Sequence, residues 1–392
     1  MTKEISRSFN QNNLNEDLSS LAFFDPSGGP SIARYDTVKY PQLLKLQEKM
    51  IGFFWVPEEI SLDRDRTDFN KMTDGQKQIF TETLLRAVLL DSIQGRSPNL
   101  ILLPVVSLPE VEVLIETWSF NETVHSSAYS YIIRNIYSSP DEIFNRLPHI
   151  EGIVDCAKDI AMYYDKVDYF NTLRALHQQN KDVSLVIDGK DVVYDEYEHK
   201  KAFWLMLTAI NALESLRFYS AFAVFFNFAE NQIMQGNAKE LQLIARDESI
   251  HVGITTQLLN IISTEDKDFA KIKSECVSEV AKIYNDVVAQ EIDWVNFVFR
   301  DETLLGLNVP ILTDYVKYLS RQKMRQFGVP EEMMNFEKIR SNPLPWMDNW
   351  LNTGSMQVAP QESEIINYLT GGVDMVDLDE YEFDFDFDDN II

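Results

Sequence analysis

The chain has 392 residues, 45% of them hydrophobic, and a formal net charge of −27 at pH 7. This length and apolar content can bury a large core, while the strong negative charge disfavours binding to nucleic acid or to an anionic membrane. Charges interrupt every long apolar stretch, so no transmembrane helix is predicted.

The remaining composition points to a cytoplasmic protein. The polar N-terminus has no apolar signal-peptide core. The two cysteines, Cys156 and Cys276, lie far apart and form no C-x-x-C pair, which excludes a disulfide scaffold and a thiolate metal site. Neither a P-loop nor a G-x-G-x-x-G motif is present, so no phosphate-binding loop is expected.

The first 30 residues are polar and end in DPSGGP, which predicts an N-terminal arm. From about residue 40 to 335 the apolar pattern is helical. Thr73 and Gln76 have capping-box spacing, which predicts the start of a helix that continues to Gly95.

Ser107 and Glu110 repeat the capping-box spacing and predict a second long helix, to about residue 137. Shorter helices are expected over about 141–180. The stretch VSLVIDGKDVVY has two β-rich segments around an Asp-Gly pair, and it predicts one small β-hairpin.

A helix of about 35 residues is expected over 196–234. Asn237, with Glu240 three residues later, predicts the cap of the next helix, which reaches about residue 262. Another helix is expected over about 265–300. Several of these helices are more apolar than surface helices, so we predict an all-α assembly in which they lie inside a bundle.

The C-terminal end has a different character. The last 22 residues carry nine acidic and no basic residues. This predicts a disordered acidic tail. A purely solubilising tail is one interpretation, but Tyr381, Phe383, Phe385 and Phe387 would not improve solubility, and they favour a tail that binds a partner.

Two copies of E-x-x-H lie in long apolar helices. Glu122 and His125 share one helix face, and Glu248 and His251 share another. Di-iron carboxylate bundles use two such motifs and add one carboxylate from each of two further helices. Asp91 and Glu214 are single acids in strongly apolar helical runs, where an unpaired carboxylate is costly.

These six residues predict a dinuclear metal site of four carboxylates and two imidazoles, a ligand set that suits iron or manganese. One E-x-x-H motif alone is a weak signal, since a buried Glu–His pair can simply form a hydrogen bond. A third copy, Glu196 and His199, lies in a very polar stretch, and we interpret it as solvated.

Tyr129 lies one turn beyond His125 on the same helix face. It is either a core side chain or a functional phenol. Phe218, Phe222 and Ile244 lie one or two turns from Glu214 and Glu248. If the helices pack with suitable directions, these residues form a dry pocket around Tyr129, in which an oxidised tyrosine would survive.

The chain resembles the small subunit of class I ribonucleotide reductase, of the bacterial and phage type with two iron ions and a tyrosyl radical. The resemblance extends from ARYD at 33–36 to NYLTGG at 367–372. Its motifs include FFWVPEE, LLDSIQGRSPN, ETVHSSAYSYIIRNI, NALESLRFY, GNAKELQLIARDESIH, RSNPLPW and QVAPQE. Several of these motifs contain no metal ligand, so a general likeness to ferritin-like bundles explains them poorly.

The resemblance implies a ferritin-like bundle with extra helices and a role for each matching residue. The implied metal ligands are Asp91, Glu122, His125, Glu214, Glu248 and His251. Tyr129 is the implied radical site, and Phe218, Phe222 and Ile244 form its pocket. Trp55 and Asp247 match residues that lead the radical away through His125, although a packing role for Trp55 is the simpler interpretation from spacing alone. Tyr368 and Glu362 match tail residues of the same radical route.

The implied activity is that of a ribonucleoside-diphosphate reductase. Two iron ions per chain, or manganese ions, would react with O2, and Tyr129 would lose an electron and a proton. The radical would then pass through Trp55 and Tyr368 to a separate large subunit, which binds the ribonucleotide. The family is homodimeric. The expected organisation is an arm over 1–30, a metal-binding bundle over 31–340, and a flexible tail over 341–392 that docks on the large subunit.

Two other functions use part of the same pattern. A ferritin-like oxidase or iron-storage ferroxidase needs the six ligands, but it does not need a dry tyrosine, Trp55 or a tail that carries Tyr368. A non-catalytic scaffold would use only the acidic tail, and it would contain no metal. The Phe-Asp alternation of the tail departs from the family pattern, so its docking contacts are not implied by the resemblance.

Overall fold

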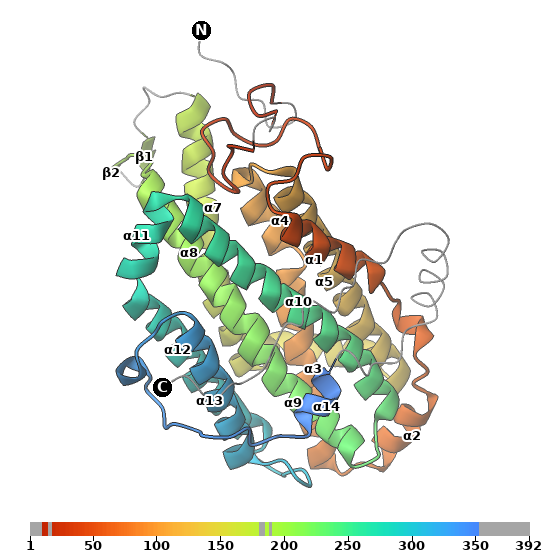
Figure 1. The fold of residues 1–392 in the computed structure, drawn as a ribbon. Helices are drawn as coiled ribbons and strands as arrows, with labels where there is room; N and C mark the ends of the chain where they lie inside the picture. The colour runs from red at the N-terminus through yellow and green to blue at the C-terminus, as the bar shows by residue number, and fades with distance from the viewer. Residues whose placement is uncertain (1–9, 15–17, 180–184, 188–189, 353–392) are drawn as a thin grey trace.

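The structure is a computed structural model that describes residues 10–14, 18–179, 185–187 and 190–352. The described chain is dominated by helices, which confirms the predicted all-α bundle (Figure 1). Its α-helices are α1 (Pro41–Gly52), α2 (Asp63–Lys71), α3 (Asp74–Gln94), α4 (Ser97–Leu102), α5 (Pro109–Ile136), α6 (Pro140–Arg146), α7 (Glu151–Gln179), α8 (Glu196–Ala212), α9 (Phe218–Glu230), α10 (Gln235–Glu265), α11 (Lys267–Glu275), α12 (Val277–Val298), α13 (Val309–Gln326) and α14 (Met347–Leu351). No helix in these ranges is long and apolar enough to span a bilayer.

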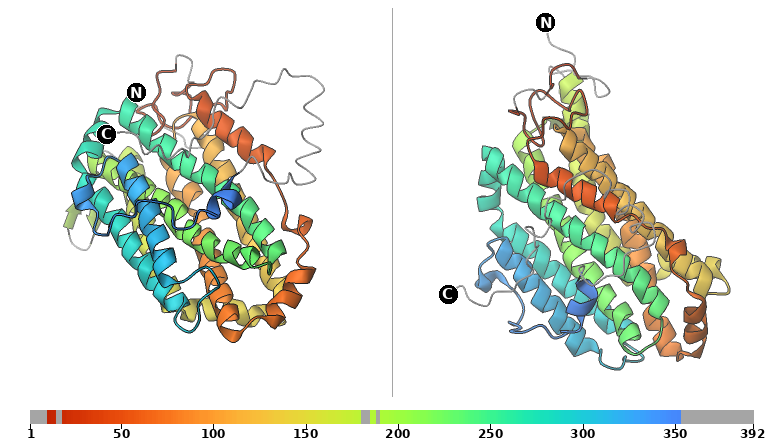
Figure 2. Two further views of the ribbon diagram at one scale, coloured as in Figure 1. Left: turned by 60° about the horizontal axis from the view of Figure 1, so that its bottom comes forward. Right: turned by 45° about the vertical axis from the view of Figure 1, so that its right-hand side comes forward.

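The longest helices run side by side along the long axis of the molecule (Figures 1 and 2). Helix α5 packs against α1 and α3, and α10 packs against α8 and α9. Helix α7 covers α3 and α8, while α12 and α13 pair with each other beside α8 and α9. This arrangement places α3, α5, α9 and α10 around one interior region.

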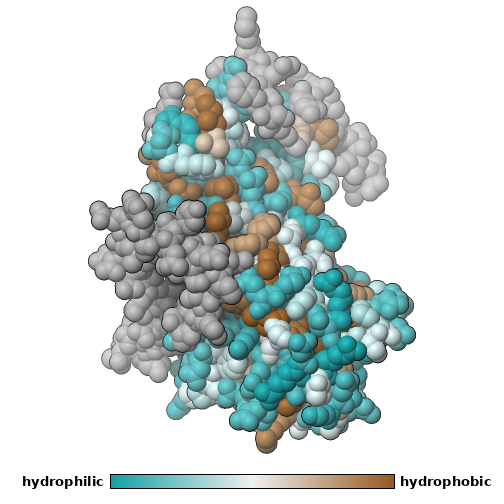
Figure 3. Space-filling model, turned by 90° about the vertical axis from the view of Figure 1, so that its right-hand side faces the viewer, coloured by the Kyte–Doolittle hydropathy of each residue, from teal (hydrophilic) through white to brown (hydrophobic). Residues whose placement is uncertain are grey.

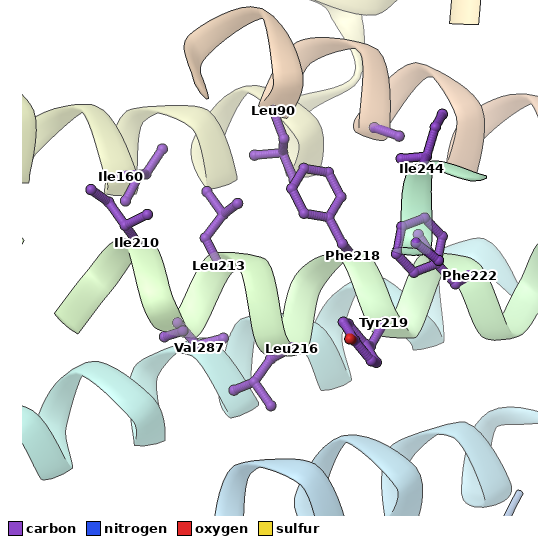
Figure 4. Packing of buried hydrophobic residues seen from close by; sticks show 14 of the residues in the cluster. Leu90, Ile160, Ile210, Leu213, Leu216, Phe218, Tyr219, Phe222, Ile244 and Val287 are labelled. Carbon is purple, nitrogen blue, oxygen red and sulfur yellow. The ribbon is translucent and has the colours of Figure 1, made fainter. Parts of the chain in front are cut away.

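The core of the bundle is continuous and rich in aromatic side chains. Leu90, Phe218, Phe222 and Ile244 are all 2% exposed or less, and Figure 4 shows them packed together between the helices. On the face seen in Figure 3, hydrophilic side chains cover most of the lower part, and hydrophobic side chains gather in a band above them. The described interior can therefore exclude water from any polar group placed within it.

The first predicted cap is confirmed. The Thr73 hydroxyl accepts a hydrogen bond from the Gln76 backbone N–H, and the Gln76 side chain accepts one from the Thr73 N–H, both at 3.1 Å. Helix α3 then runs to Gln94, and Gly95 is its C-cap. Together these groups satisfy two of the unpaired N–H groups at the helix start.

The two other predicted caps are wrong, because each side chain has a distant partner or none. Glu110 accepts hydrogen bonds from the backbone N–H groups of Lys39 and Tyr40, both at 3.0 Å, and Ser107 does not cap α5. Asn237 lies inside α10, and its side chain has no hydrogen-bond partner within the described part of the chain. Spacing alone does not show these non-local interactions.

Three helix boundaries also differ from the predicted ones. In the range where shorter helices were expected, α6 is short, but α7 fills most of the range as a single long helix. The helix expected over 265–300 divides at Cys276 into α11 and α12. The helix expected over 196–234 contains a π-helical turn, Leu213–Arg217, between α8 and α9.

Two residues of the π-helical turn make side-chain hydrogen bonds to neighbouring groups. The Ser215 hydroxyl donates to the Asn211 carbonyl at 2.6 Å, a contact that competes with regular helical bonding. Arg217 donates to Asp159 at 2.9 Å and to Gln290 at 2.7 Å. Such turns often mark functional sites, and this one carries Glu214.

The strands β1 (Leu185–Ile187) and β2 (Lys190–Val192) pair antiparallel, with Leu185 opposite Val192. They lie where the sequence predicted the hairpin. The N-terminal segment is tied to the bundle, since the Ala22 N–H donates to Glu265 at 2.7 Å and Phe23 and Phe24 are buried. The acidic tail predicted at the C-terminus lies outside the described residues.

Candidate metal centre

Four helical elements bring the six predicted ligands to one place in the core. They come from α3, α5, the π-helical turn and α10, and each of the six side chains is 0% exposed. Their ligand atoms form two groups, each with all atoms within 4.8 Å of one another. The first group is Asp91, Glu122, His125 and Glu248, and the second is Glu122, Glu214, Glu248 and His251.

Glu122 and Glu248 belong to both groups and lie between the two imidazoles. His125 Nδ1 is 3.2 Å from Glu122 Oε2 and 3.1 Å from Glu248 Oε1. His251 Nδ1 is 3.1 Å from Glu122 Oε1 and 3.1 Å from Glu248 Oε2. Each glutamate thus presents one oxygen to each imidazole, which is the geometry expected of carboxylates that bridge two ions.

The unpaired atoms of the site fit metal ions. Both oxygens of Asp91 and Oε2 of Glu214 are buried, and no described residue offers them a hydrogen bond of good geometry. Buried carboxylates are costly in that state unless they are protonated or coordinate cations. Four carboxylates also balance the charge of two divalent cations, so the site has the donors and the charge of a dinuclear metal site.

Without ions, the site retains protons on its ligands. Burial, reinforced by Glu122 and Glu248, raises the pKa of Asp91 well above its usual value. Burial and Glu248 likewise raise the pKa of Glu214. Although burial lowers the pKa of His251, the carboxylates of Glu122 and Glu248 outweigh it and raise that pKa to about 9. Cations would displace these protons.

Tyr129 lies beside the site and is 0% exposed. Burial and the charge of Asp91 raise the pKa of its phenol well above the usual value. No described residue offers this hydroxyl a hydrogen bond of good geometry. The phenol is therefore neutral, dry and close to a candidate ligand.

The three predicted pocket residues lie together in the core. The rings of Phe218 and Phe222 stack with centroids 6.2 Å apart, and Ile244 lies next to Phe222 (Figure 4). All three are 1% exposed or less. The ring stack continues through Phe226 to Trp350 in α14, with centroid distances of 6.0 and 4.8 Å.

Trp55 and Asp247 form a buried arm that ends at His125. The Trp55 indole N–H donates to Asp247 Oδ2 at 2.8 Å, and His125 Nε2 lies 3.3 Å from the same oxygen. Although burial raises the pKa of Asp247, its bonds to His125 and the charge of Arg246 lower it overall. An ionised Asp247 holds the outer nitrogen of His125 and leaves Nδ1 facing the site.

Gln94 and Tyr164 form a second buried arm that the sequence analysis missed. Gln94 Nε2 donates to Glu214 Oε1 at 2.5 Å, and the Tyr164 hydroxyl donates to Gln94 Oε1 at 2.6 Å. Gln94 follows Asp91 by three positions and so shares its helix face, which was an available signal. Tyr164 comes from α7, and no local pattern indicates it.

Trp118 was also missed. Its indole N–H donates to Glu122 Oε1 at 2.9 Å, and its ring lies 5.7 Å from that of His251. It precedes Glu122 by four positions, so helix periodicity would have placed it on the ligand face.

The prediction that the third E-x-x-H motif is solvated is wrong for its imidazole, because His199 is 0% exposed. The rings of Phe24 and Phe170 cover it, with centroids at 4.8 and 5.5 Å. Burial lowers the pKa of His199 to about 3, so this imidazole is neutral. It belongs to neither of the two ligand groups. Tyr368 and Glu362, the predicted tail residues of the radical route, lie outside the described residues.

Comparisons with known proteins agree with this geometry. The sequence profile of the family described as "Ribonucleotide reductase, small chain" matches residues 33–343. The ribonucleoside-diphosphate reductase subunit beta of Haemophilus influenzae is 41% identical over 373 residues, covering 94% of this chain and 97% of that protein. The corresponding subunit of Enterobacteria phage T4 is 36% identical and covers 94% of this chain and 96% of its own length.

Solved structures show the same fold. The ribonucleotide reductase R2 subunit of Clostridium botulinum superimposes with a TM-score of 0.66 and covers 82% of this chain and 92% of its own. Its sequence identity is 24%, so this similarity concerns the fold alone.

Proposed function

This chain belongs to the ribonucleotide reductase small-chain family, the radical-generating β subunits of class I ribonucleoside-diphosphate reductases, and from this premise we propose which of its residues hold metal, store the radical and carry it away. One observation carries the proposal. Two groups of carboxylates and imidazoles share Glu122 and Glu248, and Tyr129 lies beside them with a buried hydroxyl.

The proposed ligands are those of the two groups. One metal position is held by Asp91 and His125, the other by Glu214 and His251, and Glu122 and Glu248 bridge them. Two iron ions are the proposed occupants, with manganese as the alternative, because oxygen-rich sites with two imidazoles suit both. When bound and exposed to O2, these ions supply the oxidising power that the chain's own side chains lack.

Tyr129 is the proposed radical site. Burial keeps its phenol protonated, so oxidation must remove a proton together with an electron. Asp91 is the carboxylate whose charge acts most strongly on this phenol, and we assign it the task of fixing the hydroxyl. The apolar side chains of Phe218, Phe222 and Ile244 exclude water and reductants from the oxidised ring.

Radical transfer is proposed to follow the arm from His125 through Asp247 to Trp55. Asp247 Oδ2 accepts from the indole and faces the imidazole, so it joins the two rings through one oxygen. Beyond Trp55, we assign the route to Tyr368, with Glu362 beside it. As a β subunit the chain works with an α subunit, and the segment 341–392 is the proposed docking tail.

The remaining organisation is also proposed. Residues 1–30 form an N-terminal arm, residues 31–340 form the metal-binding bundle, and the location is cytoplasmic. The active form is a homodimer. Ile51 and Phe120 are 54% and 51% exposed on the paired helices α1 and α5, and a second copy would cover such side chains.

Electron paramagnetic resonance tests the radical assignment. The metal-free protein is loaded with Fe(II) without oxygen, exposed to O2 and compared with Tyr129→Phe. We expect a tyrosyl doublet in the parent and none in the variant, with equal iron content in both. A doublet in the variant would move the radical to another residue. A fully loaded parent without any organic radical would contradict the radical role.

Tail deletion tests the docking assignment. Removal of residues 370–392 is expected to leave iron and radical content unchanged and to abolish reductase activity with the large subunit. Full activity of the truncated chain would contradict tail docking.

A further inference from the structure

We propose that Gln94 and Tyr164 are positioning residues for Glu214. They hold its carboxylate towards one metal position, as Asp247 and Trp55 hold His125 towards the other. This inference rests on the metal centre proposed above, and it adds a function for two residues that are not themselves metal ligands.

The hydrogen bonds of this arm have only one consistent direction. A carboxylate bound to a metal ion can only accept, so the Gln94 amide must turn its nitrogen towards Glu214. The amide oxygen is then free to accept a hydrogen bond from the phenol of Tyr164. The distance from Gln94 Nε2 to Glu214 Oε1 is 2.5 Å, and that from the Tyr164 hydroxyl to Gln94 Oε1 is 2.6 Å. Aligned donors of this kind polarise one another and strengthen the bond to the carboxylate.

Burial makes the arm difficult to replace by solvent. Gln94 and Glu214 are 0% exposed, and Tyr164 is 3% exposed. The three side chains come from three separate elements, α3, the π-helical turn and α7. A buried Glu214 that lost its amide donor would have no water to substitute for it, so its orientation depends on this arm.

At each metal position, a buried arm forms a hydrogen bond with only one of the two ligands that do not bridge. At the first, Asp247 holds the outer nitrogen of His125, while Asp91 faces the phenol of Tyr129. At the second, Gln94 holds Glu214, while Nε2 of His251 has no partner among the described residues. Each position therefore combines one ligand held by a buried arm with one ligand outside the arms.

This arrangement predicts which metal ion depends on the arm. Gln94 donates to Oε1 of Glu214, and Oε2 has no donor among the described residues, so Oε2 is the oxygen available to a metal ion. Loss of the arm frees this carboxylate to rotate and should weaken binding of one ion. The other ion, held by Asp91 and His125, should be little affected.

The test is a Mn(II) titration of the full-length metal-free protein, followed by electron paramagnetic resonance and calorimetry. Tyr164→Phe removes one hydroxyl and keeps the ring, and Gln94→Leu removes the amide with little change of volume. The matched control is Tyr163→Phe, a neighbouring half-buried tyrosine of α7. Melting of each metal-free variant checks that it is folded.

We expect one of the two Mn(II) dissociation constants to rise about 10-fold or more in both arm variants, since loss of groups that orient ligands usually costs roughly 10–100-fold in affinity. The other constant should change less than about 2-fold, and the control should match the parent. Two unchanged constants in folded Tyr164→Phe or Gln94→Leu would overturn the proposal. Equal weakening of both ions would overturn it as well, because it would indicate general damage.

The same titration separates this inference from the proposed function. A parent protein that fails to bind two Mn(II) ions contradicts the dinuclear site itself. A parent that binds two ions, with arm variants that do the same, contradicts only the role of Gln94 and Tyr164.

Discussion

Two buried arms reach the metal centre, and they resemble each other in geometry but not in chemistry. In one, an indole and an imidazole meet at the carboxylate of Asp247. In the other, a phenol and a carboxylate meet at the amide of Gln94. Each arm has an aromatic ring at its outer end and a candidate ligand at its inner end.

The central residue decides what each arm can do. Asp247 is charged and accepts from both sides, so it can stabilise a positive charge or take a proton while the two rings exchange an electron. The Gln94 amide donates on one side and accepts on the other, and it neither gains nor loses a proton near neutral pH. The first arm is therefore suited to radical transfer, and the second to positioning alone.

The largest expected effect is on the first arm. Asp247→Asn keeps the size of the side chain but removes its charge, and one of its two faces then presents N–H groups to a donor. We expect reductase activity with the large subunit to fall roughly 100-fold, while the Tyr129 radical still forms on exposure to O2. Asp155→Asn, at an exposed position of α7, is the control. Activity within about 3-fold of the parent would remove the distinction between the arms.

The second prediction concerns pH and the imidazole that neither arm supports. Since the pKa of His251 is raised from 6.5 to about 9, its stabilisation of the metal-free fold is complete below pH 6.5 and is lost as pH rises through about 9. That loss is on the order of 3 kcal/mol. Metal ions need neutral imidazole, so their affinity increases over the same range.

We therefore expect the gap in melting temperature between metal-loaded and metal-free protein to widen from pH 6.5 to 9. Differential scanning calorimetry measures this gap. His149→Gln, which changes an exposed histidine, should leave the pH profile unchanged. A gap that does not widen between pH 6.5 and 9 would show that His251 is already neutral in the metal-free site.

The third prediction uses a residue that belongs to neither arm. Trp118→Phe removes the donor to Glu122, a carboxylate shared by both metal positions. Both Mn(II) constants should rise together, by about 10-fold, in contrast to the one-sided effect expected for Gln94. Trp204→Phe is a control, because that buried indole N–H has no partner. A one-sided effect of Trp118→Phe would show that Glu122 does not bridge.

The smallest effect tests whether the arms act separately from the stability of the helices that carry them. Thr73→Ala removes the cap of α3, the helix of Asp91 and Gln94. It should cost about 1 kcal/mol of unfolding free energy and leave both Mn(II) constants unchanged. Urea unfolding measures the first quantity. A change in either constant would mean that the arm and the helix start are coupled.

The ligand set was predictable because its signals are local. Each E-x-x-H motif lies on one helix face, and Asp91 and Glu214 are conspicuous as single acids in apolar runs. The two arms were predictable only in part. Trp55 and Asp247 came from the family resemblance, whereas Tyr164 reaches Gln94 from another helix, and the sequence contains no periodic signal for that contact. His199 was misjudged for the same reason, since Phe24 and Phe170 bury it from distant segments.

The π-helical turn at Leu213–Arg217 has a consequence for the tolerance of this helix to length changes. Each residue of a regular α-helix rotates the chain by about 100°, so the wide turn shifts the phase of α9 relative to α8. The turn holds one more residue than an α-helical turn in nearly the same rotation, so deleting one residue there would restore an ordinary helix and leave Phe218 and Phe222 facing Ile244. A deletion further along α9 has no such compensation, and it would rotate every later side chain by about 100° at once.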